Sequence, residues 1–446
     1  MDALTRTLGR RESSLRIYCI SGAIPGKRWR RGICRSLLCS STDLERSLMA
    51  LIPPPQELLD AIVDELRLDR PSLAACCAAS RLLRPRACKH LFRDVTVHPK
   101  SYQSLYRLVR SSRVIPRFIL VLRVYGGEFA GSDQWAKDLA ILFKALRNVK
   151  ELRVHSMIWG SFLAKHKPSL HEALISMPIT SLHLDRVCFS NSVELFSVLS
   201  QIRSLKRFSL GTFISSHSVS QLPLPSPAIP LTLRELSLDM ENSAGVVKCL
   251  LSQPHPLIYL QNVKVLEVHG CSNYDVGTVR SIVMGCPSLE HLIFGQSHLC
   301  TSFKRTFLLQ FDPSAALTLA GRNGTLDVSH LKYLTVTILD CSTQLQWWVD
   351  MFLLLKCECR IEVVTIVVEM RGWGHSPGSA AFFQAARWRA LDRALTSPAK
   401  AFLRKVVVKL STLDYSVSED LLKPFEATIH KSCSSLREKG LLQVVT

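Results

Sequence analysis

The sequence predicts an α/β protein in which three short helices near the N-terminus precede a long series of parallel strand–helix units. Two observations carry this prediction. An apolar stretch with its own helix boundaries lies between residues 51 and 97, and after it the pattern apolar-x-x-apolar-x-apolar recurs along the chain. Stretches with helical periodicity separate successive copies of that pattern. With 446 residues, the chain is long enough for two or three domains or for one extended array.

The overall composition favours a folded protein. Hydrophobic residues make up 47% of the chain and charged residues 21%, as is typical of globular proteins. The 56 Lys and Arg against 36 Asp and Glu give a formal net charge of +20, a balance that invites a nucleic-acid interpretation. However, the basic residues are spread along the chain, and no basic run alternates with stacking aromatic side chains. Nucleic acid is therefore not the partner that we favour.

The cysteines and the apolar runs indicate the compartment. The 15 Cys are scattered without repeated spacing, so we expect reduced, mostly buried thiols rather than a disulfide framework. No run approaches the roughly 18 apolar residues that a membrane span requires. We therefore expect a cytoplasmic or nuclear protein that does not bind membranes.

Residues 1–47 differ in composition from the rest of the chain. They carry paired basic residues and several Ser, with few acids and no long apolar period. A mitochondrial presequence has some of these properties. We interpret the segment instead as a disordered basic tail, or as an upstream extension of a domain that starts near Met49.

Residues 48–97 contain the signals for three helices. Pro54 and Pro55 suit a helix start, where a missing N–H costs nothing. Asp69 or Ser72 can cap a second helix, and Arg84 before Pro85 marks the boundary of a third. The first helix has one apolar face, formed by Leu58, Leu59, Ile62, Val63 and Leu66. The second has a smaller face, formed by Leu73, Cys76, Cys77 and Ala79.

These residues resemble an F-box of the large mushroom-type fungal families. The resemblance lies in Pro55-x-Glu57-Leu58-Leu59-x-x-Ile62-x-x-x-Leu66, Leu73, Ala75-Cys76, Arg81, Pro85-Arg86, His90-Leu91-Phe92 and Ser111-Ser112-x-Val114-Ile115-Pro116. The chain departs from the family at Pro54, Ser80 and Leu83, where Leu, Cys and an aromatic residue are usual. The resemblance implies docking on a Skp-type adaptor through Pro55, Leu58, Leu59, Ile62 and Leu66. Without it, the segment would be a plain three-helix cap on a larger domain.

Residues 98–117 predict a linking helix that closes before Pro116, and the repeating pattern occupies residues 118–410. Most copies are about 26 to 30 residues apart, the spacing of long leucine-rich repeats. Two gaps are about 42 residues long, before Leu334 and before Val406. The copies are Ile119/Leu122/Val124, Val149/Leu152/Val154, Ile179/Leu182/Leu184, Leu205/Phe208/Leu210, Leu233/Leu236/Leu238, Val263/Leu266/Val268, Leu289/Leu292/Phe294, Leu331/Leu334/Val336, Ile361/Val364/Ile366 and Phe402/Val406/Val408.

These units predict an irregular leucine-rich-repeat-like solenoid. One strand and one helix cannot bury an apolar face alone, and stacked neighbours close the core. Cys286-Pro287-x-Leu289-Glu290 resembles a phrase common in F-box leucine-rich proteins. The alternative is a plain α/β domain, which would not be expected to keep this spacing. Residues 411–446 predict a last helix that shields the end of the array.

The sequence shows no catalytic motif. It lacks a GxSxG elbow, a phosphate-binding GxxxxGK[ST] loop, HExxH and paired CxxC. Cys357-x-Cys359 has no second pair at zinc spacing, and His171-Glu172 is interpreted as a solvated pair. We therefore expect neither an enzyme nor a bound cofactor or metal.

The remaining candidate site is a surface. In a leucine-rich strand the apolar positions point into the core, and the positions between them line the concave sheet. Their charges are mixed and indicate no clear ligand class. The residues are Arg153, His155, His183, Asp185, Arg207, Glu235, Asp239, Glu267, His269 and His291.

Together these expectations describe the substrate-recognition subunit of an SCF-type cullin–RING ubiquitin ligase. The resemblance implies a Skp-type adaptor, and through it a cullin, as partners of the N-terminal helices. The solenoid would bind a protein substrate and raise its local concentration near the ubiquitin carrier. The alternative is a repeat scaffold or a nucleic-acid-associated interaction protein without a ligase role, which Leu83 in place of an aromatic residue favours.

Overall fold

A computed structural model describes most of the chain after residue 53. The described residues are 54–126, 133–214, 230–251, 257–270, 276–295, 326–339, 342–355, 359–370, 385–412 and 419–445. The basic tail predicted for residues 1–47 therefore lies outside the described residues. The chain divides into two compact units. Unit 1 comprises residues 1–152 and 168–178, and unit 2 comprises residues 153–167 and 179–446.

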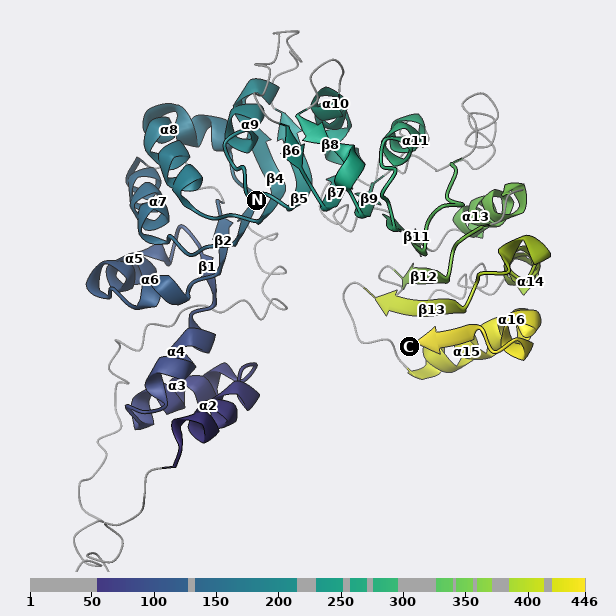
Figure 1. Cartoon of the computed structure of the whole chain (residues 1–446), viewed down its shortest axis with the longest axis horizontal. Helices are drawn as coiled ribbons and strands as arrows, with labels where there is room; N and C mark the ends of the chain where they lie inside the picture. Colours follow the sequence, from purple (N-terminus) through teal and green to yellow (C-terminus); the bar gives the residue numbers. More distant parts are fainter. Residues whose placement is uncertain are drawn as a thin grey trace, which may run out of the picture. The chain divides into compact units, whose positions relative to one another are not determined.

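Unit 1 begins with three short helices and continues into the first strands (Figure 1). Strand β3 and helix α8 are divided between the two units. The elements are α2 (Gln56–Glu65), α3 (Arg70–Ala79), α4 (Arg84–Leu91), β1 (Asp94–Val97), α5 (Tyr102–Ser111), α6 (Ile115–Phe118), β2 (Val121–Tyr125), α7 (Asp133–Ala145), β3 (Glu151–His155) and α8 (Trp159–Ser176).

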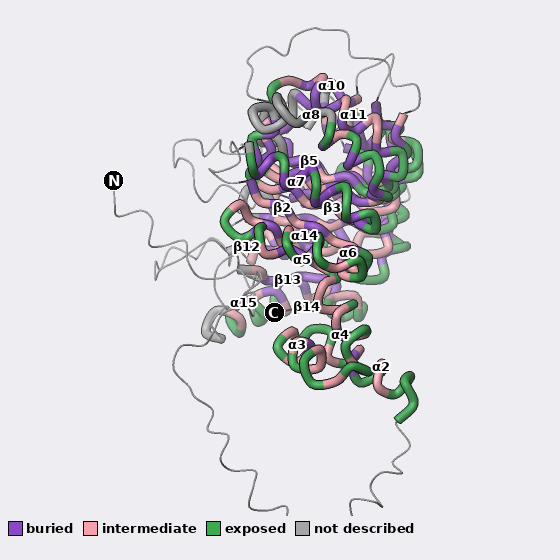
Figure 2. Tube along the Cα trace, turned by 90° about the vertical axis from the view of Figure 1, so that its left-hand side faces the viewer, coloured by how far each residue is buried: buried purple, intermediate pink, exposed green. Residues whose placement is uncertain are grey.

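Helices α2, α3 and α4 lie where the sequence predicts three helices. The Asp69 side chain accepts a hydrogen bond from the Ser72 N–H, as expected of the cap of α3. Their core is small, with Val63, Leu73 and Ala87 completely buried. On α3, Ala79 is exposed, although the sequence placed it on the apolar face. Figure 2 shows that buried residues are sparse here compared with the strands that follow.

Unit 2 is built on parallel strands that follow one another in chain order. The twelve-stranded sheet has the order β1-β2-β3-β4-β5-β7-β9-β10-β11-β12-β13-β14, and β6 with β8 forms a separate pair. The strands that lie wholly in unit 2 are β4 (Ser181–Phe189), β5 (Arg207–Ile214), β6 (Leu231–Thr232), β7 (Glu235–Asp239), β8 (Ile258–Tyr259), β9 (Val265–His269), β10 (His291–Phe294), β11 (Tyr333–Leu339), β12 (Val363–Met370), β13 (Lys405–Thr412) and β14 (Leu442–Val445).

Helices connect these strands and lie along one side of them in Figure 1. A parallel strand pair needs such a crossover, and the helix covers the apolar face of the sheet. We call the opposite side of the unit 2 strands the open face. The helices are α9 (Ser192–Leu199), α10 (Met240–Leu251), α11 (Val276–Met284), α13 (Ser342–Leu354), α14 (Ala385–Leu395), α15 (Glu419–Ser432) and α16 (Ser434–Glu438), with the short 3-10 turns η1 (Leu260–Asn262) and η3 (Pro398–Lys400).

The repeating apolar positions form the core, as predicted. The central residues of successive copies are in register across the parallel strands, so that Leu266 pairs with both Leu236 and Leu292. The residues predicted to be buried are all 2% exposed or less: Leu152, Leu182, Phe208, Leu236, Leu266, Leu292 and Leu334. The last copy needs a correction, because Phe402 is 52% exposed and its neighbour Leu403 is buried. Leu403 restores the spacing of the other copies before Val406 and Val408.

The ends of the sheet also differ from the sequence-based boundaries. Residues 94–97 belong to the segment that the sequence assigns to the three helices, and the β-rich residues 95–97 at its end lie in β1, which pairs in parallel with β2. Residues 411–446, predicted as a capping helix, include α15, α16 and then β14, which pairs with β13. Gly440 makes this return possible. Its φ of 67° suits glycine, and two backbone hydrogen bonds, from Gly440 to Arg437 and from Leu441 to Leu436, close α16.

Candidate functional site

Helix α2 of unit 1 has an apolar surface that its own core does not cover. Leu58 is 55% exposed and Ile62 is 51% exposed, while Val63 on the same helix is completely buried. Residues four apart share a helix face, so Leu58 and Ile62 lie side by side. Leu82, in the turn before α4, is also 51% exposed. The single apolar face read from the sequence is thus divided between a core side and a solvent side.

The other predicted docking residues occupy different environments. Pro55 is exposed at the start of α2, and Leu59 is half-buried. Leu66 packs against the small core around Val63 together with Leu83. Leu66 therefore contributes to packing of the helices, and the available surface centres on Leu58 and Ile62. Leu83 is half-buried and packs against this core, with fewer atoms than an aromatic residue would bring.

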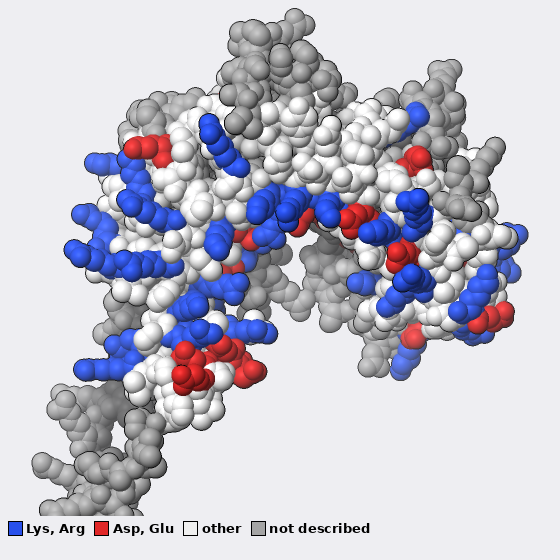
Figure 3. Space-filling view, viewed as in Figure 1, with Lys and Arg blue, Asp and Glu red and all other residues white. Residues whose placement is uncertain are grey.

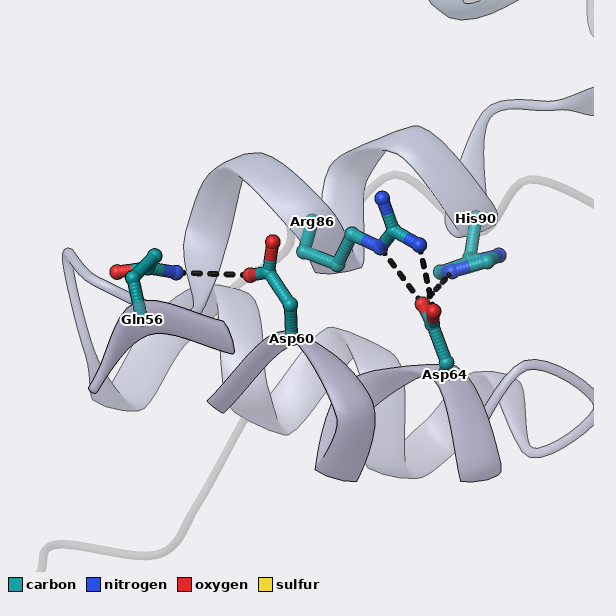
Figure 4. Close-up of polar contacts among 5 residues, drawn as sticks. All are labelled: Gln56, Asp60, Asp64, Arg86 and His90. Atoms are coloured by element: carbon teal, nitrogen blue, oxygen red, sulfur yellow. Dashed lines mark hydrogen bonds and ion pairs between the residues drawn. The ribbon is translucent and has the colours of Figure 1, made fainter. Parts of the chain in front are cut away.

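A cluster of charged side chains holds α2 against α4 (Figure 4). Asp64 of α2 accepts hydrogen bonds from the Nε of Arg86 at 2.6 Å and from the Nε2 of His90 at 2.6 Å. These hydrogen bonds, the stronger from Arg86, hold the pKa of the Asp64 carboxyl well below its usual range. We call Asp64, Arg86 and His90 the α2–α4 clasp. It fixes the orientation of the helix that carries Leu58 and Ile62.

Arg70 connects the same helices to the first strand. Its Nη2 donates to the carbonyl oxygens of Leu91 at 2.9 Å and of Asp94 at 3.0 Å. The two acceptors lie at the end of α4 and at the start of β1. A guanidinium with several donors can satisfy carbonyl groups of both elements at once. Arg70 therefore joins α3 to the point where the sheet begins.

The second candidate surface is the open face of unit 2. Parallel register places the predicted side chains in rows across neighbouring strands. Arg207 pairs with Glu235, and Asp239 with His269. His183 is on β4, Glu267 on β9 and His291 on β10. Most of these residues alternate with buried core positions, as predicted, and are half-buried or exposed.

Several of these side chains contact one another. The Nδ1 of His155 lies 3.1 Å from the Oδ2 of Asp185, and the Nε2 of His269 lies 2.8 Å from the Oε1 of Glu267. The hydrogen bond from His269 lowers the pKa of Glu267, and burial lowers the pKa of His291. Two histidines of the open face are therefore paired with carboxylates of the same face.

Asp239 does not fit the prediction of a surface residue. Its side chain is buried, with 9% exposure. Gly211 stands in the neighbouring strand, and a Cβ there would lie 3.7 Å from the Asp239 carboxylate. Helix α10 begins directly after Asp239, at Met240. Arg153, also predicted, is half-buried on β3.

Two buried thiols among the described residues are poorly suited to nucleophilic chemistry. Burial raises the pKa of the Cys286 and Cys433 thiols to about 12, so that they are not nucleophiles near neutral pH. No group of three or more His, Cys, Asp or Glu in the described ranges could hold a metal ion. What these surfaces can do is bind partners through apolar contact on α2 and through polar contact on the open face.

One basic feature was missed in the sequence. Lys206 and Arg234 directly precede β5 and β7, and both are exposed. The signal was present in the sequence, because a basic residue comes directly before the strand in several copies of the pattern, but the apolar pattern concerns only the residues of the strand itself.

No helix in the part of the chain that the structure describes is long and apolar enough to cross a membrane. Comparisons with protein-family models and with the curated proteins gave no match to this chain.

Proposed function

We propose that this chain is the substrate-recognition subunit of an SCF-type ubiquitin ligase. In this proposal helices α2, α3 and α4 form an F-box that docks on a Skp-type adaptor, and through it on a cullin. The parallel strand–helix units form a leucine-rich-repeat-like solenoid that binds a protein substrate. The observation that carries the proposal is the exposed pair Leu58 and Ile62, which coincides with docking positions implied by the family resemblance.

The apolar pair on α2 has the properties of an interface anchor. Covering exposed large apolar side chains with a partner stabilises the complex by roughly 25 cal/mol per Å² of apolar surface buried. Interface energy is usually concentrated in a few such residues. The α2–α4 clasp fixes the helix before any partner binds, so little ordering cost remains. A folded three-helix module with an uncovered apolar face therefore suits docking better than it suits a cap.

The open face of unit 2 supports the substrate-binding half of the proposal. Solenoids bind partners on extended sheet surfaces, and the rows of His, Asp, Glu and Arg offer hydrogen-bonding groups on successive strands. The side chains are held by their pairs, as in His155–Asp185 and His269–Glu267. Such prearranged polar groups favour specific recognition over strong nonspecific adhesion.

The second candidate function is a repeat scaffold without a ligase role. Leu83 is the residue that favours it, because an aromatic side chain is usual there in the family that the segment resembles. In that case the exposed apolar pair on α2 would have another partner or none.

The test is adaptor binding by the intact chain and by a variant of the exposed pair. Leu58→Asp combined with Ile62→Asp places two charges on the contact and should weaken adaptor binding by about 2 kcal/mol or more. Pull-down and titration with a purified Skp-type adaptor measure the loss. The matched control is Leu353→Asp with Leu354→Asp, because these leucines of α13 are also exposed, at 60% and 46%.

Three outcomes separate the explanations. Loss of binding in the α2 variant with normal binding in the α13 control supports the proposal. Normal binding in both variants would show that the adaptor docks elsewhere. An α2 variant that melts at a lower temperature than the control would assign Leu58 and Ile62 to stability, which their exposure argues against.

A further inference from the structure

A row of charged residues runs along the edge of unit 2 at which its parallel strands begin. Each member directly precedes a strand, and its backbone N–H donates to the carbonyl of the member before it. Arg234 donates to Lys206 at 2.7 Å, and Lys264 donates to Arg234 at 2.8 Å. The row continues in the same way through Glu290, Lys332, Glu362 and Arg404. We call it the basic edge. Neighbouring members are about 5 Å apart, the distance between adjacent strands.

The acidic members neutralise only the later part of the basic edge. The Glu290 carboxylate lies 2.8 Å from the Nζ of Lys264 and 3.5 Å from that of Lys332. Glu362 lies 3.6 Å from Arg404. These cations hold the pKa of Glu290 below its usual range, the Lys264 hydrogen bond most of all. This carboxylate therefore stays charged and satisfies its two neighbours.

The part at β5 and β7 is different. Lys206 and Arg234 are exposed and hydrogen-bonded neighbours, and neither forms an ion pair with any residue within the described ranges. Figure 3 shows Lys and Arg gathered over β5, β7 and β9. Two adjacent cations repel each other, so an anion that binds between them is attracted by both and relieves their repulsion. The open-face pair Arg207 and Glu235 follows directly in the next row.

We propose that Lys206 and Arg234 bind an acidic segment, rich in Asp and Glu, of a protein partner. This inference rests on the proposed receptor function, because it names the class of segment that the substrate-binding unit takes. The evidence for this acidic segment is its charge complementarity to Lys206 and Arg234. A short run of carboxylates can contact both cations and then continue over the polar rows of the open face, whose histidines and serines offer donors.

A protein segment fits the edge better than a nucleic acid does. Nucleic-acid binding draws on many successive phosphate contacts and, for single strands, on stacking with aromatic side chains. Glu290 and Glu362 interrupt the row and would repel a continuous phosphate backbone. The exposed aromatic side chains near the basic edge, Tyr333 and Phe402, lie beside its later members Lys332 and Arg404 and not beside Lys206 and Arg234. A short acidic stretch needs only the two unpaired positions.

The test measures binding of a fluorescein-labelled oligoglutamate peptide to the full chain at physiological salt. We expect saturable binding that weakens as salt is added and no binding of oligoglutamine. Lys206→Glu with Arg234→Glu should raise Kd by about tenfold or more, and Lys206→Gln with Arg234→Gln should raise it less, in the same direction. The matched control is Arg389→Glu with Arg393→Glu on α14, which makes the same change in net charge at exposed positions.

Two results would overturn the inference. An equal loss in the α14 control would show that net charge alone attracts the peptide. Tighter binding of an oligothymidylate, lost in the Lys206 and Arg234 variants, would make nucleic acid the partner of this edge. Adaptor binding is measured on the same samples. A chain that binds the peptide but no adaptor would contradict the receptor function and support the peptide-binding role of the basic edge. A chain that binds the adaptor but not the peptide would contradict only the role of the basic edge.

Discussion

At the scale of single residues, Asp64 has the most consequential contacts in unit 1. Its carboxylate accepts hydrogen bonds from Arg86 and His90 of α4, and so joins the helix that carries the exposed apolar pair to its neighbour. The core beneath it has only Val63, Leu73 and Ala87 completely buried. A small core leaves more of the orientation of α2 to polar contacts.

The lowered pKa of Asp64 predicts how the clasp depends on pH. A carboxyl whose pKa is lower in the folded than in the unfolded chain contributes stability above the unfolded value, here 3.8, and loses it as the pH falls through the folded value. Asp64→Asn should therefore lower the melting temperature of the chain at neutral pH. The difference from the unmodified chain should shrink in acid below pH 3.8.

Asp60→Asn is the control for this prediction. Asp60 lies on the same helix and accepts a hydrogen bond from Gln56 within α2, and its interaction with Arg86 of α4 is coulombic. We expect a smaller effect from this substitution. Equal effects of the two substitutions at neutral pH, measured by calorimetry, would show that the clasp adds nothing beyond an ordinary surface carboxylate.

At the scale of elements, the return of the chain from α16 into β14 depends on one glycine. Gly440 has a φ of 67°, a conformation that costs a residue with a Cβ about 1 kcal/mol or more. Gly440→Ala should therefore destabilise the chain by about 1 kcal/mol. Gly277→Ala in α11 is the matched control, because a Cβ there meets nothing within 4 Å. It should stabilise the chain by about 0.4–1 kcal/mol. Denaturant unfolding measures both, and a shared sign would contradict the assignment.

Much of the element order could be predicted because one physical requirement repeats. Each strand must bury two alternate side chains against a helix, so Leu236, Leu266 and Leu292 follow the same spacing in sequence and the same register in the sheet. β14 was missed because Lys439 stands where the repeating pattern needs an apolar residue before Leu442 and Val444, and a short apolar run alone cannot indicate its partner. Gly440, with the apolar run after it, was the available signal in the sequence.

The surfaces were harder to predict than the core. A helix with one apolar face does not indicate which of its leucines meet the core, so Leu66 and Leu58 looked equivalent although only Leu58 is uncovered. Asp239 shows the same limit in a strand. The alternation predicts which face of the sheet its side chain is on, but it does not predict that the side chain is buried there. Likewise, the sequence alone does not indicate that Lys206 and Arg234 are neighbours, because the parallel register of the strands brings them together.

At the scale of the whole molecule, the two proposed binding tasks lie on two different units. Unit 1 carries the exposed apolar pair Leu58 and Ile62, and unit 2 carries the open face and the basic edge. Substitutions at one surface should therefore leave binding at the other unchanged, as expected for sites without shared contacts. A receptor that brings a substrate to a ligase needs both tasks in one chain.

A calorimetric titration of the intact chain with a purified Skp-type adaptor tests the proposed adaptor docking most directly. We predict one-to-one saturable binding with a Kd of about 1 µM or lower, equivalent to about −8 kcal/mol. A folded chain that shows no binding to any Skp-type adaptor at concentrations of tens of micromolar, on the order of −6 kcal/mol, would contradict the receptor function.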